Sequence, residues 1–224
     1  MTTRYRNRME AGQILATLLT AYANRQDVLI LALPRGGVPV AYEVTKALRA
    51  PLDVFLVRKL GVPGQEELAM GAIATGGVRV INENVVLMLN IPERVINAVA
   101  AKEQEELKRR EEMYRDNLPP VDVHGYTVIL IDDGLATGST MRAAIQALRQ
   151  KQPARIVVAS PVATASVCEE LSKQVDEIAC ITVPEELFYG IGFWYEDFSQ
   201  ITDGEVRDLL ARSKQEIPPA TPKL

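Results

Sequence analysis

Short runs of apolar residues recur along this chain and are separated by longer stretches with helical periodicity. The runs are continuous rather than alternating, which is typical of strands that are covered on both faces of a sheet. Each intervening stretch is long enough to cross from one strand to a parallel neighbour. The pattern therefore predicts an α/β fold with a doubly wound, mostly parallel sheet. The expected strands are 28–33, 52–57, 127–131, 155–160 and 177–183, and the expected helices are 38–49, 139–151 and 165–173.

Three segments depart from this alternation. Residues 60–80 contain five glycines and a proline, which predict a mobile loop followed by a hairpin around Gly76 and Gly77. Residues 92–117 predict one long, charge-rich helix with a solvated charged face. Residues 184–199 hold half of the aromatic side chains of the chain, as a small hood over the core or an interface patch would.

The composition is that of one domain, 1–224, with a core at about 26–183, a hood at about 184–211 and a flexible tail at 212–224. No apolar run could cross a bilayer and no signal-peptide core follows the N-terminus, so we expect a cytoplasmic protein without membrane contact. The net charge of −4 offers no general attraction for nucleic acid, so we expect no such partner. The two cysteines and the single histidine lack metal-ligand spacing.

One segment combines acidic and small residues at the end of an expected strand. Residues 128–131 are apolar, Asp132 and Asp133 follow, and a loop of small and hydroxyl-bearing residues leads into a helix. In an open parallel sheet, ligands bind beyond the carboxyl ends of the strands. Small residues let backbone N–H groups approach an anion, and the helix N-terminus adds a partial positive charge. The loop therefore predicts a phosphate cradle beside two carboxylates.

A ribose 5-phosphate suits both parts of this site, because it carries a phosphate for the loop and a diol for the acids. The acids would accept hydrogen bonds from the hydroxyls directly or through Mg²⁺, which prefers oxygen ligands. The segment resembles the signature with which type I phosphoribosyltransferases bind 5-phosphoribosyl-1-pyrophosphate (PRPP); a Rossmann-like strand ending in acids is the alternative. The resemblance implies PRPP binding by Asp132, Asp133, Gly134, Leu135, Ala136, Thr137, Gly138, Ser139 and Thr140, and metal binding by Asp132 and Asp133 through ribose hydroxyls or water.

A second loop suited to an anion follows the first expected strand, where the chain reads Leu-Pro-Arg-Gly-Gly. The two glycines expose backbone N–H groups, and the arginine supplies a fork that matches phosphate oxygens. The loop resembles the pyrophosphate loop of the same family, which implies pyrophosphate contacts from Pro34, Arg35, Gly36 and Gly37. The family often has a cis peptide bond here, and the bond entering Arg35 is the expected one.

Arg58 and Lys59 end the next expected strand. The pair resembles that of the adenine and orotate branches, where it leads into a flexible catalytic loop, although two such charges are otherwise ordinary solvated residues. By resemblance, residues 60–76 would close over PRPP and exclude water from a developing ribosyl cation. Glu66 and Glu67 lie in that loop, where a carboxylate could move the acceptor's proton, but surface loop acids are also common. The catalytic candidates are Arg35, Arg58, Lys59 and Glu67.

The acceptor stays open, because the chain departs from the hypoxanthine-guanine branch at two positions. Ala136 stands where that branch has a purine-contacting Asp, and Trp194 stands where it has a metal-binding Asp. Phe193 and Trp194 could stack on a base, but burial in an apolar patch explains them equally well. Residues 58–72 resemble a loop of uncharacterised bacterial phosphoribosyltransferase-like proteins, a group that brings no acceptor with it.

The resemblance implies a Mg²⁺-dependent enzyme that transfers a phosphoribosyl group from PRPP to a nitrogenous base or related acceptor and releases pyrophosphate. Catalysis would stabilise charge separation, with cations around the pyrophosphate and acids beside the ribose. A non-catalytic PRPP or nucleotide sensor would keep the same cradle, and an enzyme for another phosphorylated sugar is a third alternative. Family members are often dimers, so a homodimer is a further expectation.

Overall fold

The computed structural model describes residues 4–116 and 118–217, and a five-stranded parallel sheet lies at its centre. All the strand pairings of this sheet are parallel. The predicted α/β fold is therefore confirmed. The strands are β1 (Val28–Ala32), β2 (Leu52–Val54), β6 (Thr127–Ile131), β7 (Arg155–Thr164) and β8 (Glu177–Val183), in the spatial order β2-β1-β6-β7-β8.

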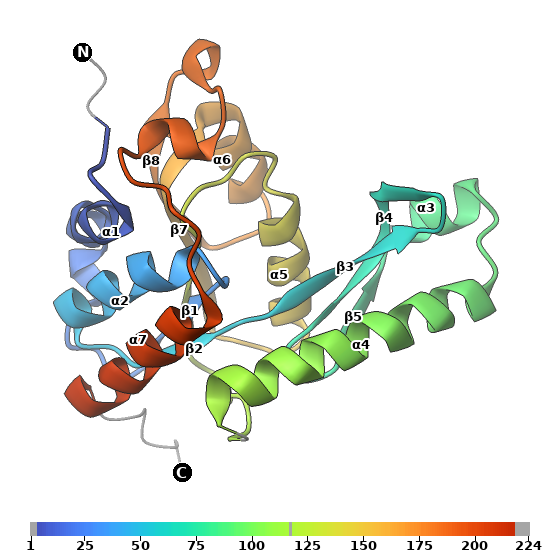
Figure 1. Ribbon diagram of the computed structural model, residues 1–224, viewed down its shortest axis with the longest axis horizontal. Coiled ribbons are helices and arrows are strands. Elements are labelled where there is room, and N and C mark those ends of the chain that lie inside the picture. Colours follow the sequence, from blue (N-terminus) through green and yellow to red (C-terminus); the bar gives the residue numbers. More distant parts are fainter. Residues whose placement is uncertain (1–3, 117, 218–224) are drawn as a thin grey trace.

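Helices cover both faces of this sheet (Figure 1). In β1, Val28, Ile30 and Ala32 face one group of helices, whereas Leu29 and Leu31 face the other, and all five are buried. Because both faces are covered, both sets of alternate residues are apolar, which explains the continuous runs in the sequence. One face carries α1 (Arg8–Ala16), the 3-10 helix η1 (Thr17–Tyr22), α2 (Gly37–Leu48) and α7 (Asp203–Glu216), and the other carries α5 (Ser139–Arg149) and α6 (Ala165–Ser172).

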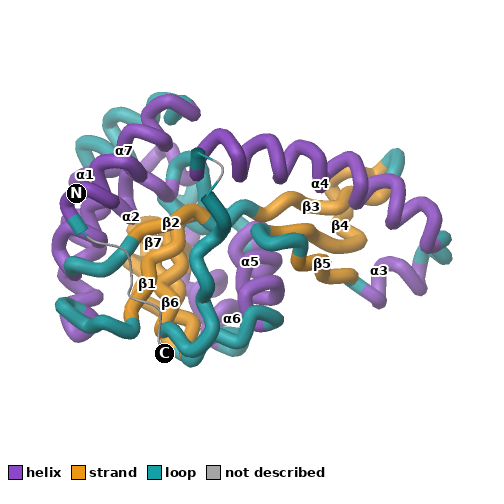
Figure 2. Tube along the Cα trace, turned by 90° about the horizontal axis from the view of Figure 1, so that it is seen from below, coloured by secondary structure: helices purple, strands orange, loops and turns teal. Residues whose placement is uncertain are grey.

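An antiparallel sheet and two helices form an arm, residues 57–115, that extends away from the core (Figures 1 and 2). The expected long helix is present, and so is the expected hairpin turn, in which Gly76 and Gly77 have φ of +79° and +76°. Such angles favour glycine. The elements of the arm are β3 (Val57–Val62), β4 (Gln65–Ala74), β5 (Val78–Ile81), α3 (Glu83–Met88) and α4 (Glu93–Arg115).

Two details of this region differ from the sequence-based expectation. The strand expected at 52–57 ends at Val54, because the apolar run continues through buried Phe55 and Leu56 into a different sheet. Residues 60–76, expected as a loop, lie mostly in the β3–β4 hairpin, whose turn contains Gly64 at φ +80°. This hairpin buries Leu60 in the core cluster that includes residues of α4, which gives the segment a reason to pair as strands.

A buried ion pair joins the arm to the core at the end of α4. The Nε atom of Arg115 lies 3.1 Å from each carboxylate oxygen of Asp53, and both residues are buried. The same guanidinium donates to the backbone carbonyl of Val54. Arg115 has a second, longer ion pair with Glu111 at 3.4 Å, whereas the buried carboxylate of Asp53 depends on Arg115 for its counter-charge.

The hood segment, residues 184–202, contains two 3-10 helices, η2 (Glu185–Leu187) and η3 (Ile191–Trp194). Trp194 and Tyr195 are buried in a small apolar cluster with Ala11 and Val162. The hood segment is therefore packed against α1 and β7. None of the described helices combines the length and apolar character needed to cross a membrane.

Helix α7 includes residues 203–211, expected as part of the hood, and residues 212–216, expected as part of a flexible tail. Thr202 and Glu205 form a capping box at its start, and the helix continues to Glu216. Residues 212–216, assigned above to a flexible tail, are thus helical. Buried Ser213 and a 2.8 Å hydrogen bond from the Tyr42 hydroxyl to Glu216 hold them against α2. The rest of the expected tail, 218–224, lies outside the described residues.

Candidate functional site

The cradle, residues 132–140, is the loop between β6 and α5. A pocket of about 270 Å³ is lined by residues 132–141 together with Ile191 of the hood segment. All the residues predicted from the sequence to bind PRPP therefore line one pocket. The pocket lies beyond the carboxyl end of β6, where an open parallel sheet binds its ligands.

Backbone donors of the cradle are available to an anion. Within the described part of the chain, the N–H groups of Ala136, Thr137, Gly138 and Thr140 donate no hydrogen bond to the protein. Gly138 has φ +68° and directly precedes α5, so the helix N-terminus with its partial positive charge opens into the pocket. This arrangement suits a phosphate group.

The loop is held from its outer side by α6. A Cβ atom on Gly138 would lie 3.2 Å from the side chain of Val167, so the two segments are closely packed. Arg142 donates to the carbonyl of Thr137 and forms a 2.9 Å ion pair with Glu170. These contacts fix the loop without using the N–H groups that point into the pocket.

The two acids of the cradle have different surroundings. Asp133 is buried, and its Oδ2 lies 2.7 Å from Nε of Arg8 at the start of α1. Its backbone carbonyl accepts a 2.6 Å hydrogen bond from the hydroxyl of Tyr195. Asp132 lines the pocket, and its carboxylate accepts only the backbone N–H of Asp133, at 2.9 Å, among the described residues.

The pKa of Asp132 is raised well above the ordinary value for Asp. The main cause is burial, and the second is the negative charge of Asp133. A carboxylate in this environment gains from a cation or from hydroxyl donors. It is therefore the acid of the pair that remains in need of a partner.

The loop after β1 packs directly against the two acids. A Cβ atom on Gly36 would lie 2.0 Å from Oδ2 of Asp133, and one on Gly37 would lie 2.7 Å from the carbonyl oxygen of Ile131. Only glycine fits such approaches. The peptide bond between Pro34 and Arg35 is cis, as expected from the resemblance. The predicted pyrophosphate loop and the predicted PRPP loop are thus neighbours.

The side chain of Arg35, in this loop, is partly exposed. Its guanidinium lies 3.8 Å from the carboxylate of Asp203 at the N-terminus of α7. Asp203 also accepts a hydrogen bond from the hydroxyl of Tyr114. A partly solvated ion pair of this length is weak, so Arg35 can exchange its partner for an anionic ligand.

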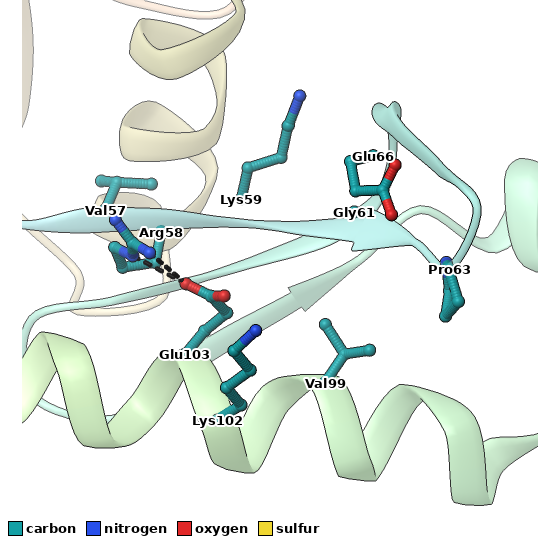
Figure 3. Close-up of a pocket in the computed structure, with 9 residues that line it drawn as sticks. All are labelled: Val57, Arg58, Lys59, Gly61, Pro63, Glu66, Val99, Lys102 and Glu103. Carbon is teal, nitrogen blue, oxygen red and sulfur yellow. Dashed lines mark hydrogen bonds and ion pairs between the residues drawn. The ribbon is translucent and has the colours of Figure 1, made fainter.

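Arg58 and Lys59 lie within β3 and leave it on opposite sides (Figure 3). Arg58 faces α4, where its Nε donates to Glu103 at 2.7 Å. Lys59 lies on the other face of β3. Val57 is on the same face as Lys59 and packs against the core cluster that includes residues of α5. The pair therefore does not act as one unit, and it lines a separate pocket of about 470 Å³ rather than the cradle pocket.

The two glutamates expected near this pair lie at the far end of the hairpin. Glu66 is exposed and accepts a 3.3 Å hydrogen bond from the backbone N–H of Gly64. Glu67 belongs to β4, and its side chain lies outside the described part of the chain. Lys102 of α4 lines the same pocket as Glu66 (Figure 3).

The hood aromatics divide into a buried and an exposed group. Trp194 is only 3% exposed, which corrects its expected availability for base stacking, whereas Phe193 is 43% exposed. Phe193 makes an edge-to-face contact with exposed Tyr189, with ring centroids 5.3 Å apart. Ile191, between them in sequence, contacts the cradle, since a Cβ atom on Gly134 would lie 2.4 Å from it.

Sequence patterns missed Arg8 and Ile191, which contact the cradle, and Tyr189, which contacts Phe193. Arg8 is separated from Asp133 by 125 positions, so no local spacing connects them. Tyr189 and Ile191 belong to the aromatic segment that the sequence identified as a hood, which was the available signal. Their distance from the cradle is set by how the hood segment packs.

Comparison with known proteins identifies relatives over most of the chain. The family described as phosphoribosyl transferase domain matches residues 4–191. A Mycobacterium tuberculosis protein, provisionally named a phosphoribosyl transferase, is 41% identical over 211 residues, which are 94% of this chain and 47% of that protein. The chain thus spans about half the length of the curated relatives that it matches there.

Two further relatives extend this comparison. The bifunctional protein PyrR of Chloroflexus aurantiacus is 32% identical over 128 residues, 56% of this chain and 64% of PyrR. The crystal structure of TT1426 from Thermus thermophilus superposes with a TM-score of 0.83 at 38% identity, covering 94% of this chain and 99% of that one. The fold over 94% of the chain therefore has a solved counterpart.

Proposed function

The chain belongs to the phosphoribosyl transferase domain family, and on that basis we propose that it transfers a phosphoribosyl group from PRPP to a nitrogenous base or related acceptor, with release of pyrophosphate. One observation carries this proposal. The cradle pocket combines unpaired N–H donors at one end with the carboxylate of Asp132 at the other, beside the Arg35 loop. A phosphate, a diol and a pyrophosphate each have matching chemistry there.

In the proposed complex, the 5-phosphate lies on the N–H groups of residues 136–140 and the ribose diol faces Asp132. The pyrophosphate lies against Arg35 and the backbone of Gly36 and Gly37. Hydrogen bonds to charged groups contribute about 1.5–3 kcal/mol each, so several converging donors hold a phosphate without a lysine. Asp133 was expected to share the role of Asp132, but its carboxylate is already paired with Arg8.

The residues present fit Mg²⁺ as the cofactor. Asp132 offers carboxylate oxygen and has a raised pKa, which a nearby cation would lower. No group of three or more His, Cys, Asp or Glu side chains among the described residues could hold a metal ion. Most ligands would therefore come from PRPP and water, as is common for Mg²⁺. When bound, the ion neutralises charge on the pyrophosphate.

The reaction breaks the bond between ribose C1 and the pyrophosphate oxygen and forms a bond from C1 to the acceptor nitrogen. The electron pair of the broken bond leaves with pyrophosphate, where Arg35 offsets the growing negative charge; Lys59 would add to this only when the β3–β4 hairpin closes over PRPP. Asp132 favours the positive charge that develops on the ribose. The acceptor's proton passes to a carboxylate of the β3–β4 hairpin, for which we propose Glu67, or to water.

Arg58 would join the pyrophosphate site only by leaving Glu103. This pairing favours a second candidate function, a non-catalytic PRPP sensor on the same fold, because one of the expected catalytic cations is occupied. For the acceptor we propose the exposed aromatic pair of Tyr189 and Phe193, because Ile191, between them in sequence, lines the cradle pocket. A flat nitrogenous ring suits such a surface.

Release of pyrophosphate from PRPP, measured with Mg²⁺ and a panel of purine and pyrimidine bases, tests the proposal. We expect release that depends on one class of base and is lost in Asp132→Asn. Asp122→Asn is the matched control, because Asp122 is an exposed acid that precedes β6, whereas the cradle follows the other end of that strand. No release with any base, together with tight PRPP binding, would favour the sensor; no binding of PRPP would overturn both.

A further inference from the structure

The N-terminal segment, residues 4–8, runs beside the hood segment. The backbone N–H of Tyr5 donates to the carbonyl of Trp194 at 2.9 Å, and the N–H of Glu196 donates to the carbonyl of Tyr5 at 2.8 Å. The N–H of Asp197 donates to the carbonyl of Arg6 at 3.0 Å. These bonds make the two segments one paired unit, although they are nearly 190 residues apart in sequence.

Arg8 connects this paired unit to the cradle. Its Nε donates to the carboxylate of Asp133 at 2.7 Å, and its Nη1 donates to the carbonyl of Ser199 at 2.9 Å. Its guanidinium lies 3.9 Å from the ring centre of Phe198, a distance that suits a cation–π contact. One buried side chain therefore contacts a cradle acid, the hood backbone and a hood aromatic ring.

Asp133 lines the cradle pocket and is also held by the protein. Arg8 pairs with its Oδ2, the hydroxyl of Tyr195 donates to its backbone carbonyl, and Gly36 leaves no room for it to turn toward the loop after β1. A carboxylate buried in this way is stable only while its counter-charge remains. The position of this cradle acid therefore depends on Arg8.

We propose that Arg8 is a positioning residue: it holds the cradle acid Asp133 in place and fastens the N-terminal segment and the hood segment to the cradle. The expected effect on PRPP binding rests on the proposed function; the anchor does not. Through Ile191, which lines the cradle pocket, the position of the hood segment sets the shape of the donor site.

The first measurement needs no ligand. Trp194 is the single tryptophan of the chain and is buried in the hood cluster, so its fluorescence reports whether the hood segment is in place. In Arg8→Met, we expect red-shifted emission and faster hydrogen exchange in residues 4–8 and 194–199. Arg6→Met is the matched control, because Arg6 pairs with Glu10 on the exposed surface of the same segment. Unchanged emission and exchange in Arg8→Met would overturn the anchor.

The second measurement is the affinity for PRPP with Mg²⁺. Loss of a residue that orients a ligand-binding group commonly costs about 10–100-fold, and we expect a weakening of that size in Arg8→Met with none in Arg6→Met. Arg8→Lys keeps the charge but lacks the fork that reaches Asp133 and Ser199 together, so it should rescue affinity in part. A displaced hood with unchanged PRPP affinity would overturn the positioning role.

A third variant keeps the test decisive if Arg8→Met folds poorly. The double variant Arg8→Met/Asp133→Asn removes both charges, so it should unfold at higher denaturant concentration than Arg8→Met alone. An equal or lower midpoint would overturn the anchor. If the wild-type protein binds no PRPP, the proposed function and the role of Asp132 fail, while the fluorescence of Trp194 still decides the role of Arg8.

Discussion

Gly36→Ala tests how closely the two predicted ligand loops are packed. Gly36 has φ −61° and ψ −32°, which alanine adopts freely, so the substitution carries no backbone penalty. The added Cβ atom would lie 2.0 Å from Oδ2 and 2.5 Å from Cγ of Asp133. Asp133 cannot move aside without loosening its ion pair with Arg8.

The magnitude follows from which contact gives way. Overpacking alone costs about 1–3 kcal/mol, and breaking a buried ion pair costs about 3–5 kcal/mol. Because the clash is with the carboxylate itself, we expect the larger range for the loss in free energy of unfolding. For a domain of this size, each 1 kcal/mol corresponds to roughly 2–4 °C, so Tm should fall by roughly 6–20 °C.

Denaturant-induced unfolding monitored by Trp194 fluorescence gives the free energy of unfolding, and calorimetry gives Tm. Gly204→Ala is the control, because a Cβ atom there would have its nearest neighbour at 3.8 Å, and the residue lies in the first turn of α7. We expect that control to be neutral or to gain up to about 1 kcal/mol. A free energy of unfolding for Gly36→Ala within about 0.5 kcal/mol of wild type would refute the packing described here.

Three further predictions concern single side chains. Folding raises the pKa of Asp132 above its ordinary value of 3.8, so the stability that this group contributes is present below pH 3.8 and is lost as pH rises through the folded pKa. Asp132→Asn should therefore be more stable than wild type at neutral pH, and this advantage should disappear in acid. A variant that is less stable than wild type at pH 7 would contradict this. Arg115→Met should lower the free energy of unfolding by about 3–5 kcal/mol, because it leaves the buried carboxylate of Asp53 without its counter-charge. The control Arg207→Met removes an exposed pair with Asp116 and should change the free energy of unfolding by less than about 1 kcal/mol. Equal effects of the two variants in denaturant titrations would count against the buried pair. Lys59→Met should lower kcat for pyrophosphate release at least about tenfold, as expected for loss of a group that stabilises transition-state charge, and an unchanged kcat would contradict its role. A similar loss in Arg58→Met would show that Arg58 leaves Glu103 during the reaction.

The sequence was sufficient to predict the central sheet and the cradle, because both depend on local patterns. Continuous apolar runs mark strands that are buried on two faces, as β1 and β6 are. The cradle is contiguous in sequence, so its acids, small residues and helix start necessarily meet in space. The same holds for the loop after β1 with its cis peptide bond.

The remaining features depend on contacts between distant segments. Apolar spacing shows that Phe55 and Leu56 are buried but not that the chain changes sheets there. Likewise, aromatic content predicted a hood, but only the packing of that segment shows that Trp194 is buried and Phe193 exposed. The pairing of Arg8 with Asp133 has no sequence signal, since a lone arginine near the N-terminus has many alternative partners.

The difference between the two acids also illustrates what a motif leaves out. Adjacent acidic residues at a strand end point to the same ligand by resemblance, and the sequence offers no basis for separating them. In the structure, both line the pocket, but Asp133 is paired with Arg8 whereas Asp132 accepts the backbone N–H of Asp133. Their roles are therefore distinguished by burial and partners rather than by residue type.

Isothermal titration of the wild-type protein and Asp132→Asn with PRPP, with and without Mg²⁺, tests the donor site most directly. We expect wild-type binding that requires Mg²⁺, and an affinity at least about tenfold weaker in Asp132→Asn, since one lost charge-assisted hydrogen bond is worth about 1.5–3 kcal/mol. The variant should be folded and, at neutral pH, more stable than wild type, so weaker binding cannot be traced to unfolding. Equal affinity of the two proteins for PRPP would contradict the assignment of Asp132 and of the cradle.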